Sequence, residues 1–265
     1  NNFYNRSLLH ESILTYATTF GGGHSLKFTG VFASLKNESS SNSISATQFP
    51  NDATLNEAIA LGVNRNVGSG RSESRLDSYL GRVNYGYRDK YFLDLTARYD
   101  GASQFGANNK YGFFPAVSAA WRLIEEPFLK EVAWMSDLKL RGSYGLTGNA
   151  GAIGPYQSLA LVGSGGNNAY SFNHQYTVGL APTGIPNTDL QWERSTQANI
   201  GLDFGLFNNR FSAVIDVYSK RTDNLLFVRQ LPPSSGYTTI TGNFAKIQNR
   251  GIELAVNGRV LDGDV

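Results

Sequence analysis

The chain of 265 residues combines a low content of charged side chains, 17%, with a high aromatic content, 12%, and it contains 29 glycines. An average soluble protein carries about 25% charged residues, and this Gly-rich, aromatic-rich composition suits strands and turns, so a helical bundle is excluded. The net charge of +2 gives no long-range field that would attract nucleic acid, and the absence of Cys excludes disulfides and thiolate metal sites.

Alternation between apolar and polar side chains recurs along the chain. In residues 91–99 the odd positions are Tyr, Leu, Leu, Ala and Tyr, whereas Asp, Thr and Arg lie between them. Such a period of two is typical of a strand with one apolar and one polar face. We predict about nine strands of roughly ten to fourteen residues, longer than the usual five or six. The segments that carry the pattern are 7–20, 24–36, 76–88, 91–99, 111–122, 138–144, 198–204, 211–217 and 252–257.

The connections between these strands alternate between short and long. The short turns are 21–23, 88–90 and 207–210, and the long connections, rich in Ser, Asn, Gly, Thr and Pro, are 37–75, 101–110, 148–190 and 223–246. The remaining connection, 123–136, is expected to contain one helical turn. No stretch approaches the roughly 18 consecutive apolar residues of a membrane-spanning helix, but a barrel strand needs only about 9 to 11 residues. The pattern predicts an antiparallel transmembrane β-barrel with short periplasmic turns and long extracellular loops.

A soluble β-sandwich also has alternating strands, and it is the structural alternative. Two features favour the barrel. Charged side chains occupy the middle of polar strand faces, which suits a wet lumen, and aromatic side chains mark the strand ends, as an interfacial girdle does. The girdle candidates are Tyr79, Tyr87, Tyr91, Tyr99, Tyr111 and Trp121.

The alternation also assigns the two faces of the barrel wall. We predict that the polar face lines the lumen and that the apolar face contacts lipid. The expected lumen residues are Asp94, Arg98, Lys139, Arg141, Asp203, Asp216 and Glu253. The expected lipid-facing residues are Leu93, Leu95, Ile200, Leu202, Ile215, Ile252 and Leu254.

Four stretches carry a more specific pattern. They are 98–122, which begins RYDGASQFG, 136–149 (SDLKLRGSYGLTGN), 190–203 (LQWERSTQANIGLD) with its continuation to residue 226, and 243–254 (NFAKIQNRGIEL). In order and spacing, residues 76–260 resemble the barrel of the SusC/RagA family of TonB-linked outer-membrane transporters. Among the individual motifs, the polar residues 100–109 suit a turn at the outer rim, and Trp192 is interpreted as an interfacial anchor.

The resemblance implies a barrel of about 22 strands that encloses a plug, of which residues 1–265 form part of a single barrel domain. The plug and the N-terminal regions are expected to lie outside this sequence. The implied function is TonB-dependent import of oligosaccharides or peptides across the outer membrane, with a SusD-like surface lipoprotein as a lid and the TonB complex as the energy source. A passive porin and a soluble or surface-attached glycan-binding β-sandwich are the alternatives.

Catalytic and metal-binding patterns are missing from the sequence. His10, His24 and His174 are scattered, without the spacing of a zinc site, and no nucleophile elbow or phosphate-binding loop occurs. We therefore expect no enzyme activity and no cofactor.

Aromatic and amide side chains gather in two of the long loops. Tyr170, Phe172, His174 and Tyr176 lie in loop 148–190, and Tyr237 lies in loop 223–246. Aromatic faces stack on sugar rings or apolar side chains, so we predict that these five residues contact the ligand. The alternative is that they only pack the loops or contact the lid.

Overall fold

A computed structural model describes residues 2–51, 53, 57–151, 153–164 and 168–259 of the chain. Nine long strands form one sheet in the order β1-β2-β3-β4-β5-β6-β11-β12-β13, so each strand pairs with its neighbour in this series. The strands of this sheet are β1 (Asn2–Phe20), β2 (His24–Thr47), β3 (Asn64–Tyr87), β4 (Tyr91–Ala102), β5 (Tyr111–Arg122), β6 (Met135–Asn149), β11 (Glu193–Leu206), β12 (Phe211–Gln230) and β13 (Thr239–Gly258). All eight pairings are antiparallel, which confirms the predicted fold class.

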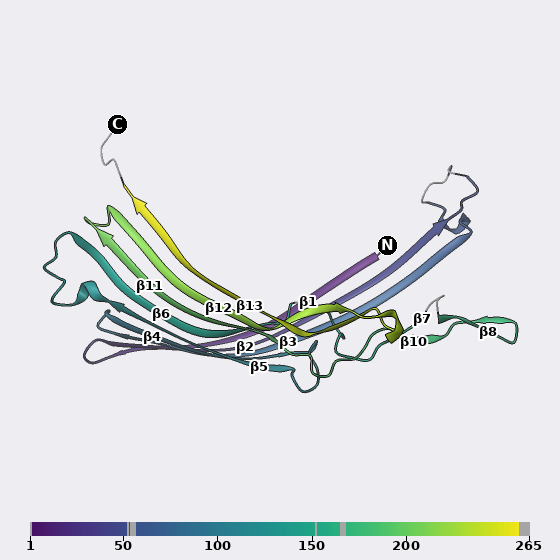
Figure 1. Cartoon of the computed structure of the whole chain (residues 1–265), viewed down its shortest axis with the longest axis horizontal. Coiled ribbons are helices and arrows are strands. Elements are labelled where there is room, and N and C mark those ends of the chain that lie inside the picture. The colour runs from purple at the N-terminus through teal and green to yellow at the C-terminus, as the bar shows by residue number, and fades with distance from the viewer. Residues whose placement is uncertain (1, 52, 54–56, 152, 165–167, 260–265) are drawn as a thin grey trace.

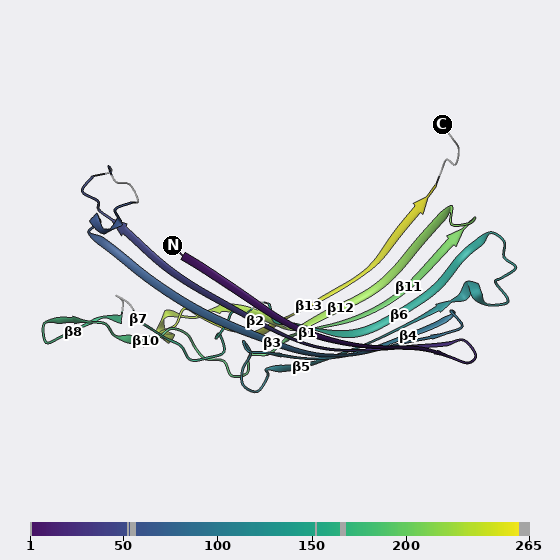
Figure 2. The same cartoon turned by 180° about the vertical axis from the view of Figure 1, so that it is seen from behind.

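The sheet is strongly curved and open, with β1 and β13 as its edges (Figure 1). The view from behind shows the same curvature (Figure 2). No second sheet of comparable size packs on it in the described ranges, because the remaining strands form only two sheets of two strands each. The β-sandwich alternative is therefore wrong.

Short and long connections lie at opposite ends of the sheet, as predicted (Figure 1). All three predicted short turns use left-handed backbone. The angle φ is +84° at Gly22 and +88° at Gly23 in the first turn, +52° at Arg88 and +55° at Asp89 in the second, and +51° to +60° at residues 207–209 in the third. Such turns match the twist of the strands that they join. Turn 123–134 begins with the 3₁₀ helix η2 (Leu123–Glu125), close to the predicted helical turn.

The long connections contain the remaining short elements. These are η1 (Ile59–Leu61), β7 (Val162–Ser164), β8 (Tyr170–Phe172), β9 (Gln175–Thr177), β10 (Leu180–Pro182) and η4 (Pro233–Ser235). No helix in the described part of the chain is long and apolar enough to span a membrane.

Several strands extend further than predicted. Residues 37–47 and 64–75, expected to be loop, are paired without interruption as the outer halves of β2 and β3. Likewise β12 and β13 leave only residues 231–238 between them, although the register shifts near Asn224. The prediction was wrong for residues 37–47 and 64–75 because these outer segments are rich in Ser, Asn and Gly on both faces, so they lack the period of two while their backbones still pair.

Residues that are partners in neighbouring strands lie on the same face of the sheet. The register therefore confirms the two faces that we predicted from the sequence. Asp94, Ser118 and Ser143 are successive partners on one face, whereas Leu95, Val117 and Tyr144 are successive partners on the other. We call these the polar face and the apolar face. All seven residues predicted for the lumen share the polar face, and all seven predicted for lipid share the apolar face. Because an Arg or Lys facing lipid at the midplane costs about 2–4 kcal/mol, the polar face is the one that lines the lumen.

Aromatic rings form a continuous row on the apolar face near the short turns. Ring centroids are 5.1 Å apart for Phe20 and His24, 4.5 Å for His24 and Tyr87, 6.3 Å for Tyr87 and Tyr91, and 6.0 Å for Tyr91 and Trp121. The polar ends of the last two rings meet the turn, because the Tyr91 hydroxyl and the Trp121 indole both donate to the Glu126 carboxylate, at 2.7 and 3.1 Å. These hydrogen bonds, the one from Tyr91 first, hold the pKa of Glu126 below its ordinary value.

Further aromatic residues lie eight positions along the same strands. Tyr79 on β3 packs at 5.1 Å from Phe32 of β2, and Tyr99 on β4 stacks at 5.1 Å on Tyr111. Eight residues span about 26 Å along a strand, or about 20 Å along the axis of a barrel whose strands tilt by about 40°. This is close to the height of the apolar band of an outer-membrane barrel, which is about 25 Å. The aromatic residues therefore bracket the membrane-spanning part of the sheet.

The two faces differ in their tolerance of charge, and neighbouring positions at the centre of β4 test this. In protein refolded into lipid vesicles, we expect Leu95→Arg to lower the free energy of unfolding by about 2–4 kcal/mol, because position 95 faces lipid midway between Tyr91 and Tyr99. Thr96→Arg, on the polar face, is the matched control and should cost clearly less. Urea unfolding measures both, and an equal loss in the two variants would contradict the assignment of faces.

Candidate functional site

A network of charged side chains lies on the polar face of β6, β11 and β12. The Arg141 guanidinium donates through Nε to both oxygens of Asp203, at 2.9 and 3.0 Å, and through Nη2 to Oδ2 of Asp216, at 3.0 Å. Lys139 lies at the edge of the group, with its Nζ 4.0 Å from Asp203 Oδ2. These four residues come from three neighbouring strands, and the network ties those strands together on the lumen side.

Gly201 makes this bridge possible. It is the strand partner of both Arg141 and Asp216, so the guanidinium crosses over its Cα to reach the second carboxylate. A Cβ at position 201 would lie 2.7 Å from the Arg141 Cζ, and it would also collide with Asp216 Oδ1. A larger residue would therefore displace the arginine.

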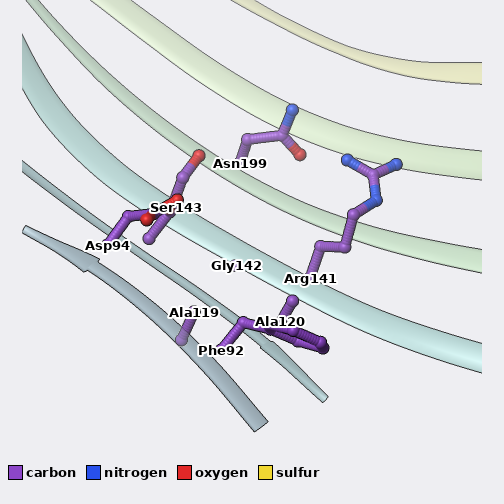
Figure 3. Close-up of a pocket in the computed structure, with 9 residues that line it drawn as sticks. Phe92, Asp94, Ala119, Ala120, Arg141, Gly142, Ser143 and Asn199 are labelled. Atoms are coloured by element: carbon purple, nitrogen blue, oxygen red, sulfur yellow. The ribbon is translucent and has the colours of Figure 1, made fainter. Parts of the chain in front are cut away.

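Beside the network, the polar face is hollowed into a cavity of about 220 Å³. Figure 3 shows Asp94, Ser143, Asn199 and Arg141 around this cavity, extending from neighbouring strands. Asp94 is itself held by Asn84, whose amide donates to it. Among the described residues, Asn199 Oδ1 and Asp216 Oδ1 are buried acceptors without a hydrogen-bond partner. Polar and ionised groups thus line this part of the wall, which suits hydrophilic cargo or a hydrophilic protein segment.

A second cluster lies where the strands meet the long loops. We call it the loop-base cluster, and its buried members are Ala102, Phe105, Phe114, Ile153, Leu190 and Trp192. The centroid of the Trp192 ring lies 4.7 Å from that of Phe105 and 5.4 Å from that of Phe114, which it meets edge-on. The Trp192 indole nitrogen donates a hydrogen bond to the Lys110 carbonyl at 3.1 Å. Only 5% of Trp192 is exposed, so the interpretation of this residue as an interfacial anchor is wrong. The adjacent charges in the sequence suggested a membrane interface, but the loops fold over the ring and bury it.

Polar side chains join the same loops. The buried Glu193 carboxylate accepts from the Asn149 amide at 2.7 Å and from the Leu226 backbone at 2.9 Å. The Asn243 side chain bonds both backbone polar groups of Gln191, at 3.0 and 2.8 Å, and also donates to the Asn224 carbonyl at 2.6 Å. Three stretches of the distinctive sequence pattern therefore meet here, and they hold together segments far apart in the chain.

Gly106 shows why the motif around Phe105 requires a glycine. Its backbone N–H donates to the Leu190 carbonyl at 3.0 Å, and a Cβ there would collide with the Thr188 backbone. Turn geometry alone, on which the sequence interpretation relied, therefore understates the role of this residue, because it also allows the close approach of loop 150–192.

The predicted ligand residues lie apart from both clusters. Tyr170 and Phe172 are on β8 and share one face of the β8–β9 hairpin, whereas Tyr176 on β9 pairs with Ser171 and takes the opposite face. His174 is in the connecting turn, with φ +62°. The rings are highly exposed, 69% for Phe172 and 72% for Tyr176. The hairpin thus presents aromatic side chains on both of its faces, beyond the barrel wall.

Tyr237 belongs to a different loop, between η4 and β13. Its backbone N–H and carbonyl both bond the Ser235 hydroxyl, at 3.2 and 3.0 Å. It therefore forms part of a tight local turn. In the described part of the chain, no group of three or more His, Asp or Glu side chains could hold a metal ion.

Known proteins share this architecture. A family model described as "TonB dependent receptor-like, beta-barrel" matches residues 1–263. TonB-dependent receptor P3 of Formosa agariphila is 38% identical over 253 residues, which cover 95% of this chain and 25% of that protein. TonB-dependent receptor SusC of Bacteroides thetaiotaomicron is 37% identical over 223 residues, which cover 82% of this chain and 21% of that protein.

Solved structures show the same sheet. The RagAB peptide transporter matches 98% of this chain and 28% of its own chain, with a TM-score of 0.86 and 29% identity. The siderophore receptor PirA from Acinetobacter baumannii has a TM-score of 0.61 at 15% identity over 96% of this chain and 34% of its own, and this shows likeness of fold alone. The chain thus spans only about a quarter of the length of the relatives that it matches.

The arginine bridge can be tested through two glycines on neighbouring strands. We expect Gly201→Ala to lower the free energy of unfolding by about 1–3 kcal/mol, because the new Cβ overpacks against Arg141. Gly142→Ala is the control, since no atom lies within 4 Å of a Cβ at that position, on the apolar face. Urea unfolding of vesicle-refolded protein measures the difference, and equal effects of the two changes would show that the bridge does not depend on Gly201.

Proposed function

Because the chain belongs to the TonB-dependent receptor family of outer-membrane β-barrels, we propose that it forms part of the barrel wall of a nutrient importer. The cargo is an oligosaccharide or a peptide. The observation that carries this proposal is the match of residues 1–263 to the family, which coincides with a sheet that is apolar on one face and charged on the other. A passive porin does not account for that family membership.

The class of cargo is supported by two of the relatives. The chain is 37% identical to SusC, and it superposes with a TM-score of 0.86 on a structure named as a peptide transporter. The relatives are named as receptors and transporters rather than enzymes, in agreement with the expectation that this chain has no catalytic role. The polar face adds a physical reason, because ionised groups such as the Arg141 network keep the path through the barrel hydrated.

The partners follow from the same proposal. A SusD-like surface lipoprotein would close the barrel mouth above the long loops, and the TonB complex would act through a plug. That plug would lie in parts of the protein outside residues 1–265. In this arrangement the loop-base cluster gives the loops a fixed platform on which cargo or lid can dock, since Trp192 and Glu193 anchor them to the barrel rim.

The β8–β9 hairpin is the proposed point of contact with cargo, together with His174 in its turn and Tyr237 in the neighbouring loop. Exposed aromatic faces on a short, paired hairpin can stack on sugar rings or on apolar side chains of peptides. The other possibility is that the hairpin contacts the lipoprotein lid. The two roles differ in what is lost on mutation.

The complete transporter provides the test. We expect the combined change Tyr170→Ala, Phe172→Ala and Tyr176→Ala to lower the apparent affinity for cargo about tenfold or more, since each stacked ring contributes about 0.5–1.5 kcal/mol. Uptake of labelled oligosaccharide or peptide and co-purification of the lipoprotein are measured side by side. Two further variants show which face of the hairpin is responsible. One carries Tyr170→Ala and Phe172→Ala together, and the other carries Tyr176→Ala alone. Unchanged uptake with lost lipoprotein would assign the hairpin to the lid, and no change in either would remove it from both roles.

A further inference from the structure

A cluster of basic side chains lies on the apolar face beyond the aromatic residues of β2 and β3. Lys36 and Arg75 are direct strand partners, and they share their face with Phe32 and Tyr79 because the pairing of β2 with β3 continues without a register shift. Arg71, four residues further out on β3, and Arg6 on β1, the partner of Glu38, lie on the same face. We call Arg6, Lys36, Arg71 and Arg75 the outer cationic cluster.

The distance from the aromatic residues places this cluster at the membrane surface. Lys36 is four residues beyond Phe32, and Arg75 is four residues beyond Tyr79, on the side of the long loops. Four residues correspond to about 13 Å along a strand, or about 10 Å along the barrel axis at a tilt of about 40°. The headgroup layer is roughly 5–7 Å thick on each side of the hydrocarbon core, and Lys and Arg can extend their long side chains toward it. The side chains of Lys36 and Arg75 can therefore reach the outer-leaflet headgroups, whereas Arg71 lies four residues further from the membrane.

Two carboxylates organise the cluster without neutralising it. Lys36 Nζ lies 2.6 Å from Glu38 Oε1 and 3.3 Å from Glu73 Oε2, and Arg71 Nη2 lies 3.8 Å from the same Glu38 oxygen. The bonds to Glu38 and Glu73 raise the pKa of Lys36 above its ordinary value, so this residue stays cationic. Four cations thus face Glu38 and Glu73.

The remaining charges on this face leave an excess of positive charge. Asp77, one row nearer the aromatic residues, accepts a hydrogen bond from Ser34 at 2.6 Å. With Asp77 included, four cations still outnumber three carboxylates. Arg75 forms no ion pair within 4.0 Å in the described ranges, and the Arg71 side chain is 74% exposed, so both guanidinium groups can accept an external anion.

We propose that the outer cationic cluster, through Lys36 and Arg75, binds the phosphate of an anionic lipid in the outer leaflet. The cluster continues the lipid-facing surface of β2 and β3 and lies neither on the lumen face nor on the loop tips, so lipid headgroups are the molecules that Lys36 and Arg75 would meet. A guanidinium presents two parallel donors that match two phosphate oxygens, and Lys36 adds a compact charge beside it. This site is separate from cargo binding and independent of the identity of the cargo.

The complete receptor in neutral-lipid nanodiscs, titrated with monophosphoryl lipid A and followed by native mass spectrometry, tests the site. Each cation near a membrane surface contributes about fivefold in binding, so we expect the double change Lys36→Gln and Arg75→Gln to weaken lipid A binding roughly 25-fold. The matched control is Lys27→Gln with Arg82→Gln, which removes a Lys and an Arg from the same two strands but from the polar face. This control should bind lipid A like the wild type.

Two further measurements keep a failed fold from being mistaken for a lost site. The exchange Lys36→Arg with Arg75→Lys keeps both charges and should retain binding, while heat-modifiable migration on gels reports an intact barrel for every variant. Dephosphorylated lipid A should bind no better than a neutral lipid, and excess inorganic phosphate should not displace lipid A. Equal weakening by the two double changes, equal binding of dephosphorylated lipid, or full displacement by inorganic phosphate would each overturn the proposal.

Discussion

The structure depends on the continuous pairing of backbone N–H and C=O groups from strand to strand. In hydrocarbon no water replaces a missing partner, so every strand that crosses the membrane must keep its register with both neighbours. Here β2 and β3 pair from His24 with Tyr87 to Thr47 with Asn64 without a break. Because side chains alternate across a strand, this register also decides which residue meets lipid and which meets the lumen. A slip of one residue would exchange the two faces. The pairing of the strands and the chemical character of each face are therefore determined together.

Charge on the lumen side is tolerated because it is paired and because the register brings the partners together. Arg141 lies far in sequence from Asp203 and Asp216, yet its guanidinium lies within 3.0 Å of a carboxylate oxygen of each, on adjacent strands. Gly201 leaves the space for this bridge because it has no side chain. The same strands carry Ile200, Leu202 and Ile215 on their opposite face, so apolar side chains contact the lipid and the charged network does not.

The loop end of the sheet is stabilised differently from the barrel wall. There the long connections are held by a small buried cluster, with Phe105, Leu190 and Trp192 in the centre and Glu193 and Asn243 bonding to surrounding backbone. The regular pairing of strands in the sheet cannot hold such loops, because the loops leave the sheet. Their aromatic and amide residues therefore divide into two groups: a buried group that fastens the loops to the rim, and an exposed group on β8 and β9 that is available for contact.

The sequence by itself determined the all-β class, nine strands, the alternation of short and long connections, and the residues of each face. These properties depend on period and turn chemistry, which are local, so Leu93, Asp94 and Leu95 reveal their faces without any partner. The sequence did not reveal that residues 37–47 and 64–75 are strands, because polar residues on both faces erase the period while pairing persists. Nor did it reveal that Trp192 is buried or that Gly201 makes room for Arg141, because both facts arise from segments that meet only after the chain has folded. The tertiary structure alone decided these contacts, since burial and pairing across strands depend on the register of the whole sheet.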